Sequence, residues 1–284
     1  MEVFSLDVLT EKFYGEERDF LENHYPGISL SRIKSELSHY STETEYTAFF
    51  NQLRKGKPLE YIRSRAYFYK SEFYVDGNVL IPRSETEILV EQASLFAKKM
   101  NRQIDEKFKF IDIGTGSGAI ALSLVQELDF PVSGVATDIS SGALEVAKKN
   151  NFFLRFKYSK ESNIDFKVAD RLEGIKEKFH LVLSNPPYIK ESDDRHKVHH
   201  QVEKYEPHLA LYLKDEEYDS WFNKLFKQAQ DALFEGGMFY MEGHEDHLEY
   251  QKNILEKFDF KDVQVVKDYT GRDRFLKGIK TCKN

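Results

Sequence analysis

The stretch that decides the fold is Phe108–Gly118, FKFIDIGTGSG, in which an apolar run leads directly into a glycine-rich turn. The run 108–113 predicts a buried strand, and the residues 118–128 that follow predict a helix. Glycine is needed where a backbone turns tightly and lets a ligand approach. Because ligands of open α/β sheets bind beyond the carboxyl ends of strands, we expect a ligand at 114–118.

Strands and helices alternate along the rest of the chain in the same way. Further strands are predicted over 132–137, 164–168, 181–184, 238–241, 263–266 and 275–279. Further helices are predicted over 88–99, 143–150 and 221–234, with Gly236 and Gly237 as a turn. This alternation predicts an α/β fold: a parallel, doubly wound, Rossmann-like sheet with helices on both faces.

The first 66 residues have a different pattern, typical of short helices. Apolar residues between 3 and 13 recur at helical spacing, and Gly15 predicts the end of that helix. A second stripe covers 30–37, and a capping box of Thr42 and Glu45 begins a third helix. We therefore expect a helical domain over 1–66.

A strand-rich linker is expected over 67–82, and the main domain over 83–284. In the linker, Asp76-Gly77-Asn78 is a turn signal between two short apolar runs.

Composition excludes several classes of protein. The 284 residues are 40% hydrophobic, which does not fit a disordered chain. The 41 basic and 48 acidic residues give a net charge of −7, which argues against a protein that coats duplex nucleic acid. The single cysteine, Cys282, excludes an internal disulfide and any multi-cysteine metal site. No apolar run has membrane length, and the start carries Glu2 and Asp7 without a basic region, so we expect a soluble cytoplasmic protein.

A second motif, Asn185-Pro186-Pro187-Tyr188, follows the predicted strand 181–184. The two prolines fix φ and donate no backbone N–H, so carbonyl oxygens there are left as acceptors. Asn185 adds a side-chain carbonyl and an amide, and Tyr188 adds a flat aromatic face. Together these groups predict a pocket for a planar NH₂ group.

Such a pocket suits transfer of a methyl group to nitrogen. An amide or exocyclic amino nitrogen is a poor nucleophile because its lone pair is delocalised. Hydrogen bonds from its two protons to the Asn185 side chain and the Pro186 carbonyl would raise electron density on nitrogen and orient it. Fixed acceptors also favour the positive charge that develops there. A hydride-transfer enzyme has no evident use for this arrangement.

The glycine loop by itself leaves the cofactor open. Asp138 ends the next strand, where its carboxylate could bind both ribose hydroxyls of either NAD or adenosylmethionine. No lysine follows the loop as in a P-loop, which argues against nucleotide triphosphate hydrolysis. Asp170 ends the third strand, where it could meet an adenine amino group.

From about Tyr67 to its end, the chain resembles the release factor glutamine methyltransferases, the PrmC/HemK family. The resemblance rests on five stretches: Val79–Glu87 (VLIPRSETE), Asp112–Gly118, Asn185–Tyr188, Tyr205–Pro207 followed by Ala210-Leu211, and Gly271–Arg274. Asn-Pro-Pro-Tyr is shared with DNA adenine methyltransferases, whereas the Pro-Arg-x-Glu-Thr-Glu block is much more specific to this family.

The resemblance implies a seven-stranded class I methyltransferase sheet with an N-terminal helical domain that docks the substrate. It implies methyl transfer from S-adenosylmethionine to the glutamine amide nitrogen in the Gly-Gly-Gln motif of class I peptide release factors. We also expect a monomer that needs no metal and binds neither a membrane nor, stably, a nucleic acid.

The same resemblance assigns roles to individual residues. The cofactor would be held by Gly114, Thr115, Gly116, Ser117, Gly118, Asp138, Asp170, Arg171 and Asn185. The catalytic residues would be Asn185, Pro186 and Tyr188, and the glutamine would also contact Pro187, Arg83 and Glu85.

Three positions depart from the family pattern. Ser84 stands where proline is usual, Arg171 replaces a residue that is often aromatic or apolar, and Met241–His244 is a variant stretch. All three bear on how the cofactor packs.

Two alternative functions compete with methylation of a release factor. The first alternative is a nucleic-acid exocyclic-amine (adenine-type) methyltransferase, which predicts a basic groove. The second is a non-catalytic binding protein on the same fold.

The histidines near 196–208 and the group His244, Glu245 and His247 lack zincin spacing, so no metal site is predicted. The polar loop 191–206 is expected to form a surface loop or a flap over the substrate, and Trp221 to serve packing.

Overall fold

The computed structural model describes residues 6–25 and 28–281, and the chain divides into two compact units. The small unit comprises Met1–Arg65 with His199–Tyr205, and the large unit comprises Ala66–Val198 with Glu206–Asn284. Cys282 and the first residues of the first predicted helix lie outside the described residues. Among 6–25 and 28–281, no helix combines the length and the apolar character that a membrane crossing requires.

The small unit is built from short helices: α1 (Leu6–Glu16), α2 (Arg18–His24), α3 (Leu30–Leu37), α4 (Glu43–Arg54), α5 (Leu59–Arg63) and α9 (His200–Tyr205). The predicted capping box is confirmed: Thr42 Oγ1 accepts from the Glu45 amide, and the Glu45 carboxylate accepts from the Thr42 amide. Gly15 lies inside α1 and does not end it, so that prediction is wrong.

Helix α9 joins the small unit although it is distant in sequence from the other helices. Gln201 Nε2 donates to the Gly56 carbonyl at 2.8 Å, and the Tyr205 hydroxyl donates to the Lys55 carbonyl. The His200 ring also meets the His24 ring edge to face at 4.7 Å between centroids. Part of the predicted polar loop 191–206 is therefore a helix that packs on the small unit.

Residues 67–82 belong to the large unit and are packed within it. The strands β1 (Arg65–Phe68) and β2 (Ser71–Tyr74) pair around a turn at Tyr69, which has φ +57°. Asn150 binds the backbone amide and carbonyl of Tyr74 at 2.7 and 2.9 Å. The predicted turn at 76–78 follows β2 and does not connect two strands, because the hairpin turns earlier.

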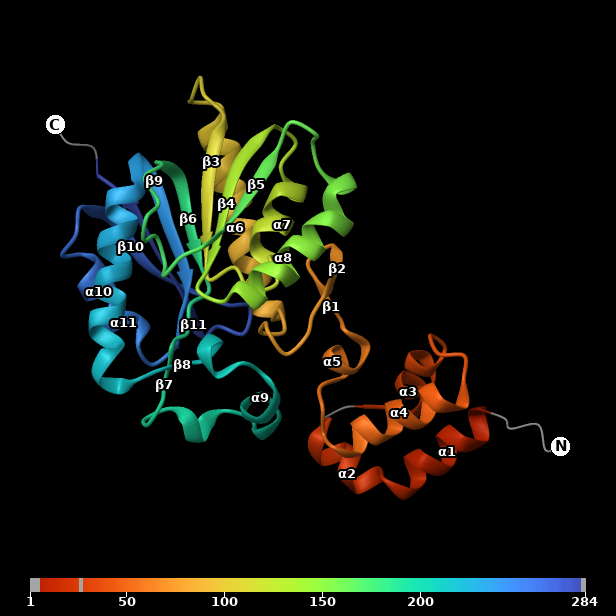
Figure 1. Ribbon diagram of the computed structural model, residues 1–284. Coiled ribbons are helices and arrows are strands. Elements are labelled where there is room, and N and C mark those ends of the chain that lie inside the picture. The colour runs from red at the N-terminus through yellow and green to blue at the C-terminus, as the bar shows by residue number, and fades with distance from the viewer. Residues whose placement is uncertain (1–5, 26–27, 282–284) are drawn as a thin grey trace. The chain divides into compact units, whose positions relative to one another are not determined.

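The predicted seven-stranded sheet is confirmed in the large unit (Figure 1). Its strands are β3 (Phe108–Ile113), β4 (Val132–Asp138), β5 (Asn163–Val168), β6 (Phe179–Ser184), β9 (Leu233–Glu242), β10 (Phe260–Lys267) and β11 (Asp273–Lys280). Their order is β10-β11-β9-β6-β3-β4-β5, and β11 runs antiparallel to both of its neighbours. The strands β3, β4, β5, β6 and β9 are mutually parallel, so their carboxyl ends share one edge.

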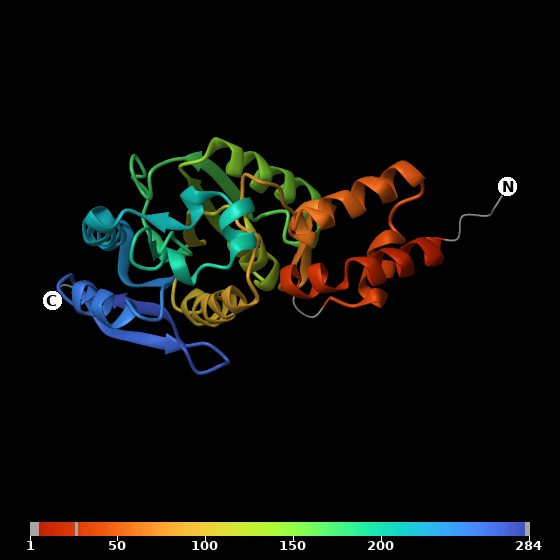
Figure 2. The same ribbon diagram turned by 90° about the horizontal axis from the view of Figure 1, so that it is seen from below.

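Helices cover both faces of this sheet. Helices α6 (Glu87–Asn101) and α7 (Ala119–Glu127) pack on one face, and α10 (Asp215–Ala232) and α11 (Leu248–Leu255) pack on the other. Helix α8 (Ser141–Leu154) follows β4. The segment that follows β6 contains the short strands β7 (Ile189–Lys190) and β8 (Tyr212–Leu213) and lies toward the viewer in Figure 2.

The predicted turn at Gly236 and Gly237 is wrong, because both lie inside β9. Strand β9 pairs Leu233 with Phe179 and then Met238 with Leu181, so its extra residues form a bulge. Gly236 has φ +76° there, a conformation that favours glycine. Helix α10 accordingly ends at Ala232, before the predicted 234.

Candidate active site

A cavity in the large unit lies at the carboxyl ends of the parallel strands. Its lining includes most of the predicted site residues: Arg83, Gly114, Thr115, Gly116, Ser117, Asp138, Asp170, Arg171, Asn185, Pro186 and Pro187. Three predicted residues, Glu85, Gly118 and Tyr188, do not line it. One edge of the sheet therefore brings together two motifs that are far apart in the sequence.

A hydrogen bond to a buried acid holds the glycine loop between β3 and α7. Thr115 Oγ1 donates to Asp112 Oδ2 at 2.6 Å, and burial raises the pKa of Asp112 to about 7. Gly114 and Gly116 have φ +68° and +55°, which side chains disfavour. A Cβ added to Gly116 would meet no atom within 4 Å, so the loop faces open space.

Gly118 has a packing function in this loop. Its φ is +80°, and an added Cβ would lie 3.1 Å from Leu122 Cδ1 and 3.3 Å from Ala147 Cβ. The missing side chain lets the start of α7 approach α8. Gly118 therefore permits close packing behind the loop and does not line the cavity.

Asp138, at the end of β4, presents a fixed carboxylate to the cavity. Its Oδ2 accepts from the Gly116 amide and its Oδ1 from the Ser140 amide, both at 2.9 Å. Burial raises the pKa of Asp138, and these amide hydrogen bonds oppose that rise. Each oxygen has lone pairs beyond the one already used, so the group can still accept hydroxyl protons.

The end of β5 adds an ion pair and an aromatic ring. Asp170 Oδ2 lies 2.7 Å from Arg171 Nη2 and 3.2 Å from Lys224 Nζ. The Arg171 guanidinium lies 4.7 Å from the centroid of the Trp221 ring, and both residues line the cavity. Trp221 was predicted to serve packing, and the unusual Arg171 was the available signal that an aromatic partner lies nearby.

The Asn-Pro-Pro-Tyr motif divides between the cavity and the protein interior. Asn185 lines the cavity, and its Nδ2 donates to Thr86 Oγ1 at 3.3 Å. Tyr188 instead packs beside the apolar cluster under α10, and its hydroxyl donates to Glu242 Oε1 at 3.0 Å. The structure thus does not bring the Tyr188 ring to the cavity wall, where the sequence predicted a flat face.

Glu242 and Thr86 join the two ends of this motif, and sequence reasoning did not assign them a role. Glu242 is only 1% exposed, and its Oε2 accepts from Thr86 Oγ1 at 2.5 Å. Burial raises the pKa of Glu242, and hydrogen bonds from Thr86 and Tyr188 together with the Arg274 charge oppose the rise. Thr86 stands in the quoted family stretch Val79–Glu87 and Glu242 in the variant stretch Met241–His244, but no local pattern pairs them.

Arg83 forms an ion pair with another buried acid, Glu206. Its Nη2 lies 2.6 Å from Glu206 Oε1, while Glu206 Oε2 accepts from the Ile81 amide at 3.1 Å. Arg83 therefore reaches the cavity wall held by Glu206, a residue quoted for the resemblance but not assigned to the site. Glu85 is exposed and accepts from the Ser84 hydroxyl at 3.1 Å.

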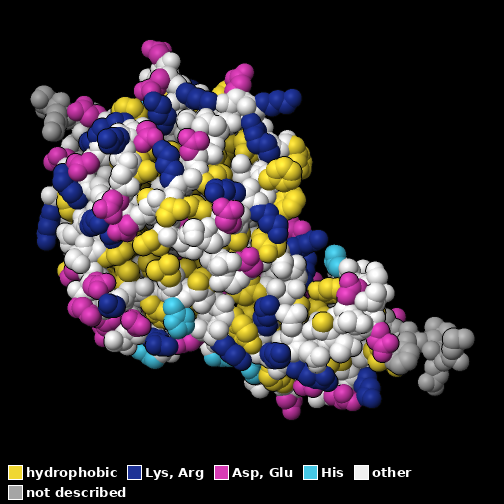
Figure 3. Space-filling model, in the orientation of Figure 1, with side chains coloured by type: hydrophobic (Ala, Val, Ile, Leu, Met, Phe, Trp, Pro, Cys, Tyr) yellow, Lys and Arg dark blue, Asp and Glu magenta, His cyan; other side chains and the backbone are white. Residues whose placement is uncertain are grey.

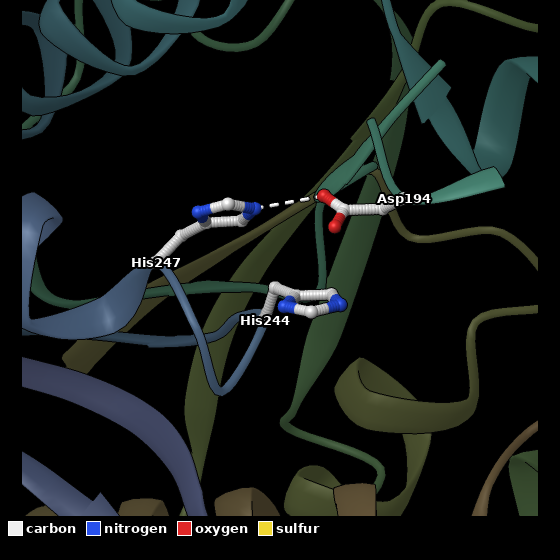
Figure 4. Close-up of side chains that lie close together, drawn as sticks. All are labelled: Asp194, His244 and His247. Atoms are coloured by element: carbon white, nitrogen blue, oxygen red, sulfur yellow. Dashed lines mark hydrogen bonds and ion pairs between the residues drawn. The ribbon is translucent and has the colours of Figure 1, made fainter. Parts of the chain in front are cut away.

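Asp194, His244 and His247 lie close together in a cluster (Figure 4). None of the three lines the cavity. His247 Nε2 lies 2.7 Å from Asp194 Oδ2, and Lys197 Nζ lies 3.0 Å from Asp194 Oδ1. The Asp246 amide donates to His244 Nδ1 at 3.2 Å. A cation already neutralises the carboxylate, so these groups satisfy one another as a hydrogen-bonded network.

Comparison with known proteins points to methyltransferases. The family model of the methyltransferase small domain matches residues 88–210. The chain is 36% identical over 230 residues to the release factor glutamine methyltransferase of Flavobacterium psychrophilum, covering 80% of this chain and 76% of that relative. It is 32% identical over 281 residues to that of Streptococcus pneumoniae, covering 96% and 94%.

A solved structure shows the same fold at low sequence identity. It is a Thermus thermophilus 16S rRNA methyltransferase in complex with AdoMet and guanosine, with a TM-score of 0.50 and 15% identity. The match covers 76% of this chain and 49% of that one. At this identity the likeness concerns the fold alone.

Proposed function

The chain belongs to the release factor glutamine methyltransferase family, and from this premise we propose that it methylates the Gly-Gly-Gln glutamine of a peptide chain release factor. The methyl group would pass from S-adenosylmethionine to the side-chain amide nitrogen. The helical small unit would dock the release factor. No metal takes part in this proposal.

The cavity fits the cofactor in its shape and its polar groups. Gly116 faces open space, because a Cβ added there would meet no atom within 4 Å. Asp138 offers two fixed oxygens for ribose hydroxyls. Arg171, whose guanidinium lies over the Trp221 ring, lines the cavity together with Trp221 where the resemblance places adenine. When bound, adenosylmethionine supplies an electrophilic methyl group.

The orientation of the Asn185 amide is the observation that carries the proposal. Its Nδ2 is used as a donor to Thr86, so its Oδ1 points the other way and can accept a proton of the substrate. Pro186 has no N–H, and its carbonyl can accept a second proton. Two acceptors match the two hydrogens of a carboxamide, orient its nitrogen and stabilise the positive charge that grows on it.

The alternative function, methylation of a nucleic-acid amino group, is not favoured. Phosphate binding calls for a basic surface, whereas the chain has a net charge of −7. On the face drawn in Figure 3, acidic and basic side chains are interspersed. The relatives named above are release factor enzymes.

The test is a methylation assay with mapping of the product. The purified protein is mixed with adenosylmethionine and a recombinant release factor, and peptides are read by mass spectrometry. We expect a gain of about 14 Da, one CH₂, on the Gly-Gly-Gln peptide. A release factor with that glutamine replaced by alanine is the control and should gain nothing. Methylation of another residue, or of added DNA or RNA alone, would overturn the proposal.

A further inference from the structure

A hydrogen-bond chain runs from the protein interior to the cavity through Glu242, Thr86 and Asn185. Glu242 Oε2 and Thr86 Oγ1 are 2.5 Å apart, and Thr86 Oγ1 and Asn185 Nδ2 are 3.3 Å apart. These residues come from the end of β9, the turn before α6 and the end of β6. Their sequence separations, 156 and 99 residues, mean that only the tertiary fold assembles the chain.

The chemistry of the three groups gives the chain one direction. Glu242 accepts from the Tyr188 hydroxyl at Oε1 and from Thr86 at Oε2, so both of its oxygens act as acceptors and the single hydroxyl proton of Thr86 is directed to Glu242. Thr86 can then only accept from Asn185, which must turn its NH₂ toward the hydroxyl. Asn185 Oδ1 is consequently directed away from the Thr86 hydroxyl, and both residues line the cavity.

We propose that Thr86 and Glu242 are positioning residues that select a carboxamide over a carboxylate as the group bound beside Asn185. This inference rests on the proposed function and deepens it. An acceptor oxygen facing the substrate matches the N–H of glutamine and repels the acceptor oxygens of glutamate. A site that must hydrogen-bond one partner discriminates strongly against an analogue that cannot supply the proton.

Substitutions can reverse or break the chain without removing Asn185. In Glu242→Gln, the new NH₂ can donate to Thr86, whose proton is then free to bond Asn185 Oδ1. That reversal turns the NH₂ of Asn185 toward the substrate and favours a carboxylate. Thr86→Val has nearly the shape of threonine but neither donates nor accepts, so the orientation of Asn185 is lost. Thr86→Ser keeps the hydroxyl and is the matched control.

The test measures binding as well as turnover. Protein loaded with adenosylhomocysteine is titrated calorimetrically with two release factors that carry Gln or Glu in the Gly-Gly-Gln motif. We expect the natural chain and Thr86→Ser to bind the Gln form at least about tenfold more tightly. The preference should fall to about twofold or less in Thr86→Val and invert in Glu242→Gln. For the Gln substrate, kcat should fall about 10²–10³-fold in both, with little change in the KM for adenosylmethionine.

Several outcomes separate this inference from the proposed function. If the protein without substitutions does not methylate the release factor, the proposed function is wrong. The ratio of its affinities for the Gln and Glu forms still tests the hydrogen-bond chain. If Thr86→Val, folded by circular dichroism, keeps the full preference for Gln, the inference is wrong. An equal loss of preference in Thr86→Ser would also overturn it, because the hydroxyl would then not be the deciding group. Should Glu242→Gln fail to fold, Thr86→Val carries the test alone.

Discussion

The two halves of the cavity edge are anchored by buried acids in different ways. On the side of the glycine loop, Asp112 accepts from Thr115, only three residues further along the chain. On the side of the Asn-Pro-Pro-Tyr motif, Glu242 accepts from Thr86, which is 156 residues away. The same pair of groups, a carboxylate and a threonine hydroxyl, is local in one half and long-range in the other.

The difference indicates what each half requires of the fold. The glycine loop can form as soon as β3 and α7 meet, because its anchor, its turn and its positive φ angles lie in one stretch. The side with the Asn-Pro-Pro-Tyr motif, the amide half, forms only when β6, β9 and the start of α6 are all in place. Variants in the first half should therefore change cofactor affinity or stability, and variants in the second half should change transfer.

The largest expected effect is in the amide half, at Asn185. Asn185→Ala removes the acceptor that faces the substrate while the glycine loop and Asp138 remain. We expect methyl transfer to fall by about 10²–10³-fold or more, the loss typical when one stabilising group is removed from an active site. Single-turnover assays with saturating cofactor measure it.

Cofactor affinity is the control for that variant. Calorimetric titration with adenosylhomocysteine should show partly retained binding, because the glycine loop and Asp138 remain in place. Near-normal turnover would remove Asn185 from catalysis. A complete loss of cofactor binding would show that the two halves are not separable.

The next effect is expected at Asp138, on the side of the glycine loop, which is the cofactor half. In Asp138→Asn an NH₂ group replaces one of the two acceptor oxygens, so one of the hydrogen bonds from the Gly116 and Ser140 amides is lost and the charge disappears. The KM for adenosylmethionine should rise about 10–100-fold, since hydrogen bonds to charged groups contribute about 1.5–3 kcal/mol. The effect on kcat should be smaller. Steady-state kinetics with varied cofactor distinguish the two, and a pure kcat loss would contradict the assignment.

The same difference decides what the sequence could predict. The β3 range and the open loop at Gly114 and Gly116 were predictable because one contiguous stretch contains the hydrophobic strand and the glycines. The glycine loop needed no knowledge of distant residues, whereas the contact between Arg171 and Trp221 did.

In the amide half, only the groups that line the cavity were predictable, and their buried partners were not. The acceptors of Asn185 and Pro186 follow from residue chemistry, but the partner of Tyr188 does not, because Glu242 comes from another strand. Thr86 was quoted only as part of a motif for the same reason. Gly236 and Gly237 were misread as a turn because a bulge inside a strand has the same local sequence as a turn.

A third effect, on stability, distinguishes two glycines of the same loop. Gly118→Ala would place a Cβ 3.1 Å from Leu122 and 3.3 Å from Ala147 at φ +80°. We expect a loss of about 2 kcal/mol in the free energy of unfolding, from backbone strain and crowding. Gly116→Ala meets no neighbouring atom, so it should cost only about 1 kcal/mol of strain but weaken cofactor binding. Urea unfolding with calorimetry tests the pair, and equal stabilities would contradict the packing function of Gly118.

A smaller effect concerns the pH dependence of stability in the cofactor half. Burial raises the pKa of Asp112 to about 7, above the value of about 3.9 in an unfolded chain. Between these values the unfolded state has lost a proton that the folded state retains, so stability falls as pH rises through this window. Asp112→Asn should flatten the curve between about pH 4 and 7, by about 1–2 kcal/mol. A curve with the same slope in both proteins would show that Asp112 does not carry it.

The smallest effect has the opposite sign and lies at Asp194, beside the amide half. Burial alone would raise the pKa of Asp194, but hydrogen bonds from His247 and Lys197 hold it at about 2. Its contribution is present above about pH 4 and is lost as pH falls toward 2, because the unfolded state then binds the proton first. Asp194→Asn should therefore lose about 1 kcal/mol at neutral pH and match the natural chain near pH 2. Urea unfolding at both pH values measures the difference. A loss that persists at pH 2 would mean that packing, and not charge, makes Asp194 stabilising.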